Sequence, residues 1–221
     1  MVLSKSAILR NKEKNKVVID PFVEANVGNC SYDVSLGEWY FRESHPKEGF
    51  TTYNPYSKKE VSRVWGLPQR AKKAKECIDN FEGISEDDLI ILIDPGETLL
   101  CHTKEFIGGR DNITTMMKAR SSMGRNFIEV CKCAGWGDIG YINRWTMEAT
   151  NNSKFYQIPL VVGRRIAQIV FFETENINEN QDYSKEGKYQ GTTEVEDLKK
   201  NWCPEMMLPR LHKDREVKKE L

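Results

Sequence analysis

The sequence predicts a mainly β fold, a sandwich or barrel with short helices and one inserted helical segment. Most of the chain alternates apolar and polar residues with a period of two, which is the pattern of strands. In the second half, short strand-like segments follow one another, separated by turn residues. Neither the glycine pattern of a dinucleotide-binding fold nor that of a P-loop is present, which disfavours alternating strands and helices.

The first elements can be read in order from the N-terminus. Ser4 can cap a short helix that continues through basic residues to about Lys16. A strand is expected over 17–22, where proline stops it, and a second over 31–37, where it ends at glycine.

Between residues 42 and 86 the composition changes, since charged and aromatic residues mix without a regular period. We interpret this region as an insertion packed on the main body. A helical pattern spans 58–80 and is broken at 66–68, Gly-Leu-Pro. The basic run 70–75 is most simply a solvated helix face.

Strands and turns dominate again after the insertion. A strand over 89–93 ends at the turn sequence Asp94-Pro95-Gly96-Glu97, and the next begins at Thr98. Further strands are expected over 127–133, 144–149, 157–160 and 166–173. A short helix is expected over 194–201, and 213–221 is interpreted as a solvated end.

Composition limits the possible partners. Lys plus Arg and Asp plus Glu both number 33, so the formal net charge is zero and no global field favours DNA, RNA or an acidic membrane. No apolar run approaches the ~18 residues of a membrane span, and the N-terminus lacks the hydrophobic stretch of a secretory signal. We therefore expect a soluble cytoplasmic protein, located in the host cytoplasm if the source is a virus.

The cysteines and histidines do not form a recognisable metal motif. Six cysteines are scattered without a C-x-x-C pair, and the three histidines show no ligand spacing with them. Cys131 and Cys133 lie two apart on an expected strand and could ligate a metal, but reduced structural thiols are the simpler interpretation. No zinc site or other protein metal site is predicted.

The most informative stretch is 120–151. Arg120, Ser121, Ser122 and Arg125 surround Gly124 and offer the charges and hydroxyls that a polyphosphate requires. Downstream, Glu148 interrupts an apolar and β-branched run, where a carboxylate is costly unless it has a task or a partner. Taken singly, these residues are more simply a loop and an ion-paired strand residue. Together they predict a nucleotide site with an acid/base residue.

The order of these and other blocks resembles the dCTP deaminase family, a branch of the trimeric dUTPase superfamily. The resemblance covers most of the chain outside the insertion and the last ~25 residues. Its blocks are M1-V-L-S4, V18-I-D-P-F22, N26-V-G-N-C-S-Y-D-V-S-L-G37, P95-G-E97, T103-K-E105, R120-S-S-M-G-R125, A134-G-W-G-D138, T146-M-E148, I166-A-Q-I-V-F-F-E173 and K188-Y-Q-G191.

The resemblance implies a dUTPase-like distorted jelly roll or β-barrel of the β-clip type over 1–191, with an insertion at about 42–86 and a polar extension over 192–221. It also implies a homotrimer with sites between subunits, and Mg²⁺ bound through the substrate's triphosphate. Glu148 matches the catalytic carboxylate, and Asp138 the position that meets the deoxyribose. The other residues implied to bind substrate are Arg120, Ser121, Ser122, Arg125, Ala134, Trp136, Gln168, Tyr183 and Lys188.

The activity implied by the resemblance is hydrolytic deamination of dCTP to dUTP and ammonia, attack on the C–N bond of a cyclic amidine. One carboxyl can perform it by shuttling a proton from water to the ring and the departing amine. Three alternatives stay open: further hydrolysis to dUMP, plain dUTP pyrophosphatase activity, and a nucleotide- or protein-binding trimer without catalysis. A modified cytosine nucleotide is an alternative substrate. dTTP is a candidate inhibitor, although Cys131 stands where bacterial members frequently carry a histidine.

Overall fold

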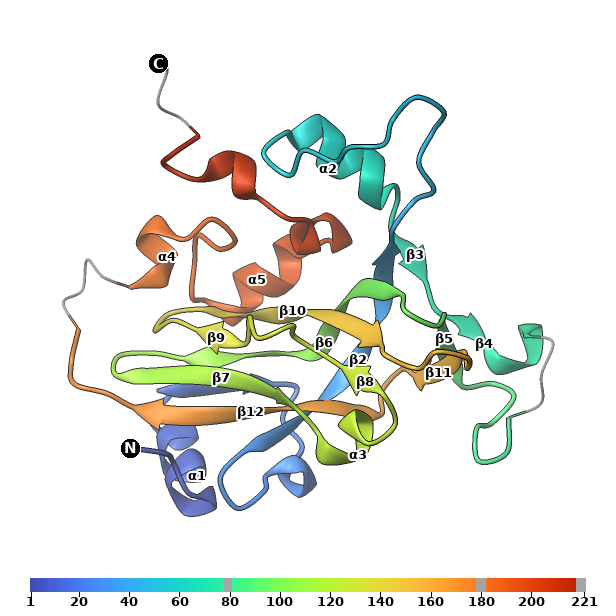
Figure 1. Cartoon of the computed structure of the whole chain (residues 1–221). Coiled ribbons are helices and arrows are strands. Elements are labelled where there is room, and N and C mark those ends of the chain that lie inside the picture. Colours follow the sequence, from blue (N-terminus) through green and yellow to red (C-terminus); the bar gives the residue numbers. More distant parts are fainter. Residues whose placement is uncertain (78–80, 178–181, 218–221) are drawn as a thin grey trace.

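A large curled antiparallel sheet forms the body of the protein. The computed structural model describes residues 1–77, 81–177 and 182–217. Within them, a nine-stranded sheet has the order β8-β10-β6-β2-β12-β7-β9, with β1 paired to β6 and β3 to β2. A second sheet, β11-β5-β4, lies beside it (Figure 1). The mainly β architecture predicted from the sequence is confirmed.

The strands are short to medium in length, and most helices have one or two turns. The strands are β1 Val17–Asp20, β2 Tyr32–Arg42, β3 Gln69–Arg70, β4 Lys72–Lys73, β5 Leu89–Ile93, β6 Thr98–Gly109, β7 Ile113–Ala119, β8 Ile128–Glu129, β9 Trp136–Gly137, β10 Ile142–Asn151, β11 Ile158–Val161 and β12 Arg165–Glu173. The α-helices are α1 Lys5–Glu13, α2 Lys58–Trp65, α3 Ser121–Gly124, α4 Tyr183–Glu186 and α5 Val195–Asn201. The 3₁₀ helices are η1 Glu24–Asn26, η2 Ala74–Glu76, η4 Pro204–Met207 and η5 Leu211–Lys213.

Strand β2 corrects one prediction, because it runs through Gly37 to Arg42 instead of ending at the glycine. A Cβ atom at position 37 would lie 2.0 Å from Cε1 of His102. The His102 ring is buried, donates from Nδ1 to the Thr103 carbonyl oxygen at 2.8 Å, and accepts at Nε2 from the Trp39 N–H at 3.3 Å. Glycine is therefore used here for a close approach within a strand, not for a turn.

The strand predicted over 127–133 is mostly absent. Only β8, Ile128–Glu129, pairs with β10, and Cys131 makes an isolated bridge to Glu148. Lys132 and Cys133 have positive φ, which ends a strand. Cys131 and Cys133 therefore do not share one face of a strand. Strand β7, which pairs with β12, was not anticipated.

The inserted segment is only partly helical. Helix α2 is present and ends at Gly66, where φ is +64°. The basic run 70–75 is not a helix face: it forms parts of β3 and β4 and then turns into η2. Its charges make exposed ion pairs, such as Arg70 with Glu38 at 2.7 Å. The remainder of the predicted pattern, 78–80, lies outside the described residues.

The C-terminal extension packs onto the sheet. Leu198 of α5 is buried against Val18, Phe106 and Ile142. In Figure 1 α5 lies over β10 and β6, and the chain then runs between α4 and α2. The helix predicted over 194–201 is confirmed. The expectation of a solvated end from 213 onward is wrong at its beginning, because Lys213 ends η5 and Asp214 forms an ion pair with Lys188.

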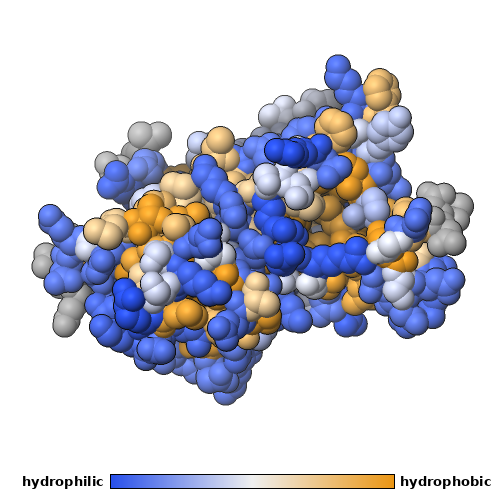
Figure 2. Space-filling view, turned by 90° about the horizontal axis from the view of Figure 1, so that it is seen from below, coloured by the Kyte–Doolittle hydropathy of each residue, from blue (hydrophilic) through white to orange (hydrophobic). Residues whose placement is uncertain are grey.

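The surface on the side of α1 and α3 is mainly hydrophilic, with apolar patches among the charged residues (Figure 2). In the part of the chain that the structure describes, no helix combines the length and apolar character needed to cross a bilayer.

Candidate active site

The curl of the sheet brings its two ends together. β9 is the last strand at one edge of the sheet, and β10 lies next to the other edge. The two strands nevertheless lie side by side, because the ring of Trp145 in β10 would overlap a Cβ atom added to Gly137 in β9. A cavity of about 620 Å³ opens beside this junction. Its lining residues are Trp65, Thr98, Leu100, Lys132, Ala134, Trp136, Gly137, Asp138, Tyr141, Trp145, Thr146, Glu148, Tyr183, Tyr189, Met207 and Pro209.

Glu148 faces this cavity because of the alternation of β10. Its neighbours Met147 and Ala149 are fully buried in the core, so the glutamate side chain points to the opposite face of the strand. Burial raises the pKa of the Glu148 carboxyl to about 7, while its own backbone N–H and Lys132 act weakly in the opposite direction. A carboxyl that titrates near neutral pH can accept and return a proton under ordinary conditions.

Asp138 lies at the other side of the junction, in a tight turn. The Tyr141 N–H donates to the Asp138 carbonyl oxygen at 3.0 Å, and Gly140 has a φ of +88° that favours glycine. Gly137 leaves room for Trp145, and its carbonyl oxygen accepts hydrogen bonds from the hydroxyls of Thr114 and Thr115. The indole ring of Trp145 therefore occupies the space that a side chain at position 137 would need.

Aromatic rings line the cavity between the two carboxylates. The Tyr141 ring meets Trp145 edge-on at 5.3 Å and Tyr183 at 5.2 Å between centroids. Trp145 donates from Nε1 to the Ile107 carbonyl oxygen at 2.9 Å, which holds its ring in place. Trp136 is 56% exposed and lies against Phe172 at 6.1 Å, so one face of its indole is accessible. These rings can bind a planar heterocycle.

The segment 188–190 closes one side of the site. Gln190 bridges to the turn after Asp138, since its Nε2 donates to Gly140 O at 2.7 Å and its Oε1 accepts from the Ile142 N–H at 2.9 Å. Lys188 lies beside the Glu148 cavity, in an adjoining hollow that also includes Trp136 and Asp138. Its ammonium is paired with Asp214.

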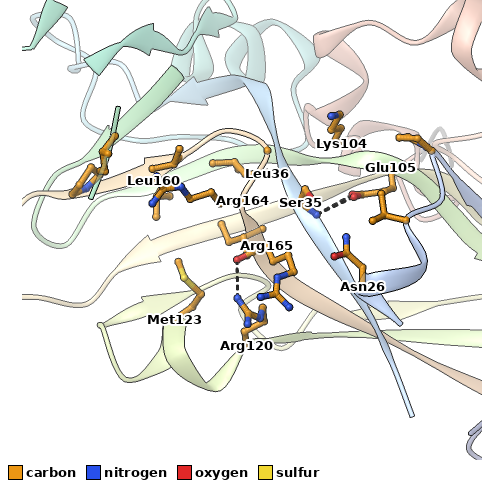
Figure 3. A pocket seen from close by; sticks show the side chains of 17 residues that line it. Asn26, Ser35, Leu36, Lys104, Glu105, Arg120, Met123, Leu160, Arg164 and Arg165 are labelled. Atoms are coloured by element: carbon orange, nitrogen blue, oxygen red, sulfur yellow. Dashed lines mark hydrogen bonds between the residues drawn. The ribbon is translucent and has the colours of Figure 1, made fainter. Parts of the chain in front are cut away.

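A second cavity, of about 650 Å³, lies elsewhere and is cationic (Figure 3). Its lining includes four basic residues, Lys104, Arg120, Arg164 and Arg165, which Figure 3 labels. Arg120 donates from Nη1 to the Arg165 carbonyl oxygen at 3.2 Å, and Asp33 pairs with both guanidinium groups at 3.3 and 2.9 Å.

A buried carboxylate also borders the cationic cavity. Glu105 is 2% exposed and accepts from the Ser35 N–H at 2.9 Å. Burial raises the pKa of the Glu105 carboxyl. The cavity therefore combines a cationic side with one buried carboxyl whose pKa is raised.

The structure divides the predicted site residues between these places. Glu148, Ala134, Trp136, Asp138 and Tyr183 share the first cavity, with Lys188 next to it. Arg120 lines the cationic cavity, which has no lining residue in common with the first. Residues 120 and 148 thus lie in one short span of sequence but at separate cavities of the chain, because Arg120 is tied to β2 and β12 while Glu148 belongs to β10.

Four predicted residues line neither cavity. Ser121, Ser122 and Arg125 are exposed on and beside α3. Gln168, half-buried in β12, accepts from the Ser31 hydroxyl at 3.5 Å.

Other lining residues escaped the sequence reasoning. Tyr141 and Tyr189 resemble ordinary core aromatics in sequence, and Met207 and Pro209 belong to a polar-looking extension without a motif. For the cationic cavity, the available sequence signal was the pair of arginines at the start of β12, Arg164 and Arg165.

No group of three or more His, Cys, Asp or Glu side chains could hold a metal ion within residues 1–77, 81–177 and 182–217.

Comparisons with known proteins agree with the fold. The model of the dCTP deaminase-like family matches residues 2–174. A protein of Methanosphaerula palustris named "dCTP deaminase, dUMP-forming" is 26% identical over 194 residues, 86% of this chain and 91% of the relative. One of the same name from a Hydrogenobaculum species is 31% identical over 179 residues, covering 80% and 85%.

Among solved structures, the 2′-deoxycytidine 5′-triphosphate deaminase of Agrobacterium tumefaciens superposes with a TM-score of 0.52 at 17% identity. The match covers 76% of this chain and 47% of that one. At this identity the similarity shows the fold alone, and it agrees with the expected mainly β architecture.

Proposed function

Because the chain belongs to the dCTP deaminase-like family, we propose that it deaminates dCTP hydrolytically and continues to dUMP. The single observation that carries this proposal is the half-buried carboxyl of Glu148, with a pKa of about 7, in a cavity lined by aromatic rings. The curated relatives are named dUMP-forming dCTP deaminases, which supports the second step.

Glu148 acts first as a base and then as an acid. The ionised carboxylate takes a proton from water as the water oxygen bonds to C4 of cytosine, and returns this proton to N3. The Glu148 carboxylate then takes the proton of the C4 hydroxyl and gives it to the amine. The C4–N bond breaks, ammonia leaves, and the C4 carbonyl of uracil forms. Near pH 7 both protonation states of Glu148 are populated, which suits both halves of the cycle.

Hydrolysis of the triphosphate requires a second water at the α-phosphorus. Its oxygen bonds to phosphorus as the bond to the bridging oxygen breaks, and pyrophosphate leaves. Asp138 lines the same cavity as Glu148. In our proposal its carboxylate positions either the water that attacks the α-phosphorus or the deoxyribose. Lys188, in the adjoining hollow, would contact the phosphates.

We further propose that the complete site forms between subunits of a homotrimer. Among the described residues, the cationic cavity with Arg120 and the cavity with Glu148 share no lining residue, which supports a site completed by a second chain. An adjacent subunit could place its cationic surface, with Arg120, Ser121, Ser122 and Arg125, against the phosphates. Mg²⁺ bound to the triphosphate would neutralise part of the charge of the phosphates.

The decisive assay incubates the protein with dCTP, measures ammonia, and separates dUTP from dUMP by chromatography. We expect ammonia and dUMP, and a loss of about 10²–10⁴-fold in Glu148→Gln with nucleotide binding retained. Glu129→Gln on β8 is the matched control, because it makes the same change outside the cavity. Ammonia with dUTP would restrict the function to deamination. Pyrophosphate from dUTP without ammonia from dCTP would overturn the proposal.

A complementation assay tests the shared site. Arg120→Ala and Glu148→Gln proteins, each inactive, are unfolded together and refolded as a mixture. If a site takes Arg120 from one subunit and Glu148 from the next, about one quarter of the sites in random trimers contain both intact residues. No recovery of activity, with mixed trimers demonstrated by mass spectrometry, would place both residues of a site in one chain.

A further inference from the structure

Two segments peripheral to the β body meet at the Glu148 cavity. Trp65, the last residue of α2, comes from the inserted region, and Met207 and Pro209 come from the C-terminal extension. The match to the family model ends at residue 174, so Met207 and Pro209 lie beyond it. The three residues line the same cavity as the proposed catalytic acid, and we call them the peripheral wall.

An apolar cluster attaches the peripheral wall to the sheet. Met207 is only 4% exposed and packs in a buried group with Phe41 of β2 and Leu100 of β6. Trp65 packs against the same group from the insertion. Leu100 is the register partner of Glu148 on the neighbouring strand, so the cluster is anchored directly beside the acid.

Polar contacts hold the chain just after Pro209. The Arg210 N–H donates to Tyr189 Oη at 3.1 Å, and its Nη1 donates to the Lys188 carbonyl oxygen at 2.6 Å. The guanidinium also lies over the Tyr189 ring, 5.2 Å from its centroid. Tyr189 itself lines the cavity, so the extension is joined to the site on two sides.

The chemistry of the wall matches one edge of a pyrimidine. Cytosine presents polar groups at C2, N3 and C4, and only C–H groups at C5 and C6. Under the proposed function, the polar edge must face Glu148 and water. Met207 and Pro209 offer carbon and a thioether sulfur, without a strong hydrogen-bonding group, which suits the opposite edge.

We propose that Met207 and Pro209 of the peripheral wall contact the C5–C6 edge of the bound pyrimidine and determine which 5-substituents the site accepts. This inference rests on the proposed function. It assigns a specificity role to residues of the C-terminal extension, which lies beyond the match to the family model.

The test compares dCTP with 5-methyl-dCTP as substrates. Met207→Ala removes bulk from the wall and should raise the ratio of kcat/KM for 5-methyl-dCTP over dCTP at least about tenfold, since one methylene-sized change in an apolar pocket has effects of this order. Leu208→Ala is the matched control, because Leu208 packs on the same cluster but does not line the cavity, and it should leave the ratio within about twofold. Pro209→Ala, at a half-buried position, provides a second variant if Met207→Ala folds poorly.

An unchanged or lowered ratio in both wall variants would overturn the inference, as would an equal rise in Leu208→Ala. Dissociation constants for the two nucleotides, measured by calorimetry without turnover, separate this inference from the proposed function. If wild-type protein releases no ammonia, the proposed function fails, while the ratio of dissociation constants still tests whether the wall contacts the 5-position.

Discussion

The ionisation of Glu148 should make the stability of this protein depend on pH in a way that one substitution removes. Burial raises the pKa of this carboxyl from 4.5 to about 7 in the folded protein. Between these two values the unfolded chain has released the proton and the folded protein still holds it. The free energy of unfolding therefore falls as pH rises through this interval, and becomes independent of this group above about pH 7.

The magnitude follows from the shift. Each pKa unit corresponds to about 1.4 kcal/mol, and the carboxyl retains partial contact with solvent, so we expect a loss of about 2–3 kcal/mol. Glu148→Gln keeps this position neutral at every pH. The free energy of unfolding of the variant, minus that of the wild type, should then increase by about 2–3 kcal/mol between pH 4.5 and 7 and stay constant above.

The assay is urea unfolding at fixed protein concentration over pH 4 to 9, followed through the fluorescence of the five tryptophans. Taking the difference between variant and wild type cancels other titrating groups. Glu129→Gln controls for the loss of a carboxylate outside the cavity. A flat difference for Glu148→Gln, or an equal rise for Glu129→Gln, would refute the argument that burial at this cavity sets the proton affinity of the proposed acid.

Three further predictions concern other parts of the chain. Gly37→Ala should destabilise the protein by about 1–3 kcal/mol in urea unfolding, because the new Cβ overlaps the His102 ring, whereas Gly191→Ala, with open space around it, should not. Asn151→Ala should lower the free energy of unfolding by about 2–4 kcal/mol, because the Asn151 side chain is fully buried and hydrogen-bonded to backbone groups of Ile93, Ser153 and Tyr156. Asn152→Ala, at an exposed position, is its control. Similar urea midpoints for the two variants would contradict this prediction. Asp214→Asn releases Lys188 from its ion pair and should tighten the binding of a nucleoside triphosphate severalfold in calorimetry. Glu216→Gln, which removes an exposed ion pair with Arg215, is the control. An unchanged affinity in Asp214→Asn would argue against contact between Lys188 and the phosphates.

Local pattern was sufficient for much of the fold. The apolar run of β5, the turn at Gly96 and the alternation in β10 depend on neighbouring residues, so the sequence predicts them correctly. Errors arose where distant residues decide the local structure. Gly37 interrupts no strand because a histidine from β6 fills the space beside it, and the basic run at 70–75 becomes strand because β2 and β5 offer partners.

For the candidate site, the sequence by itself determined the chemical groups: a lone carboxylate in an apolar run, an aspartate in a glycine turn, and a cluster of arginines and serines. Only the tertiary structure decided which of them meet. The curl of the sheet brings Asp138 to Glu148 and leaves Arg120 at another cavity, and the packing of the extension adds Met207 and Pro209. The physical reason is that strand pairing and apolar burial act between residues far apart in the chain, whereas sequence patterns report mainly on near neighbours.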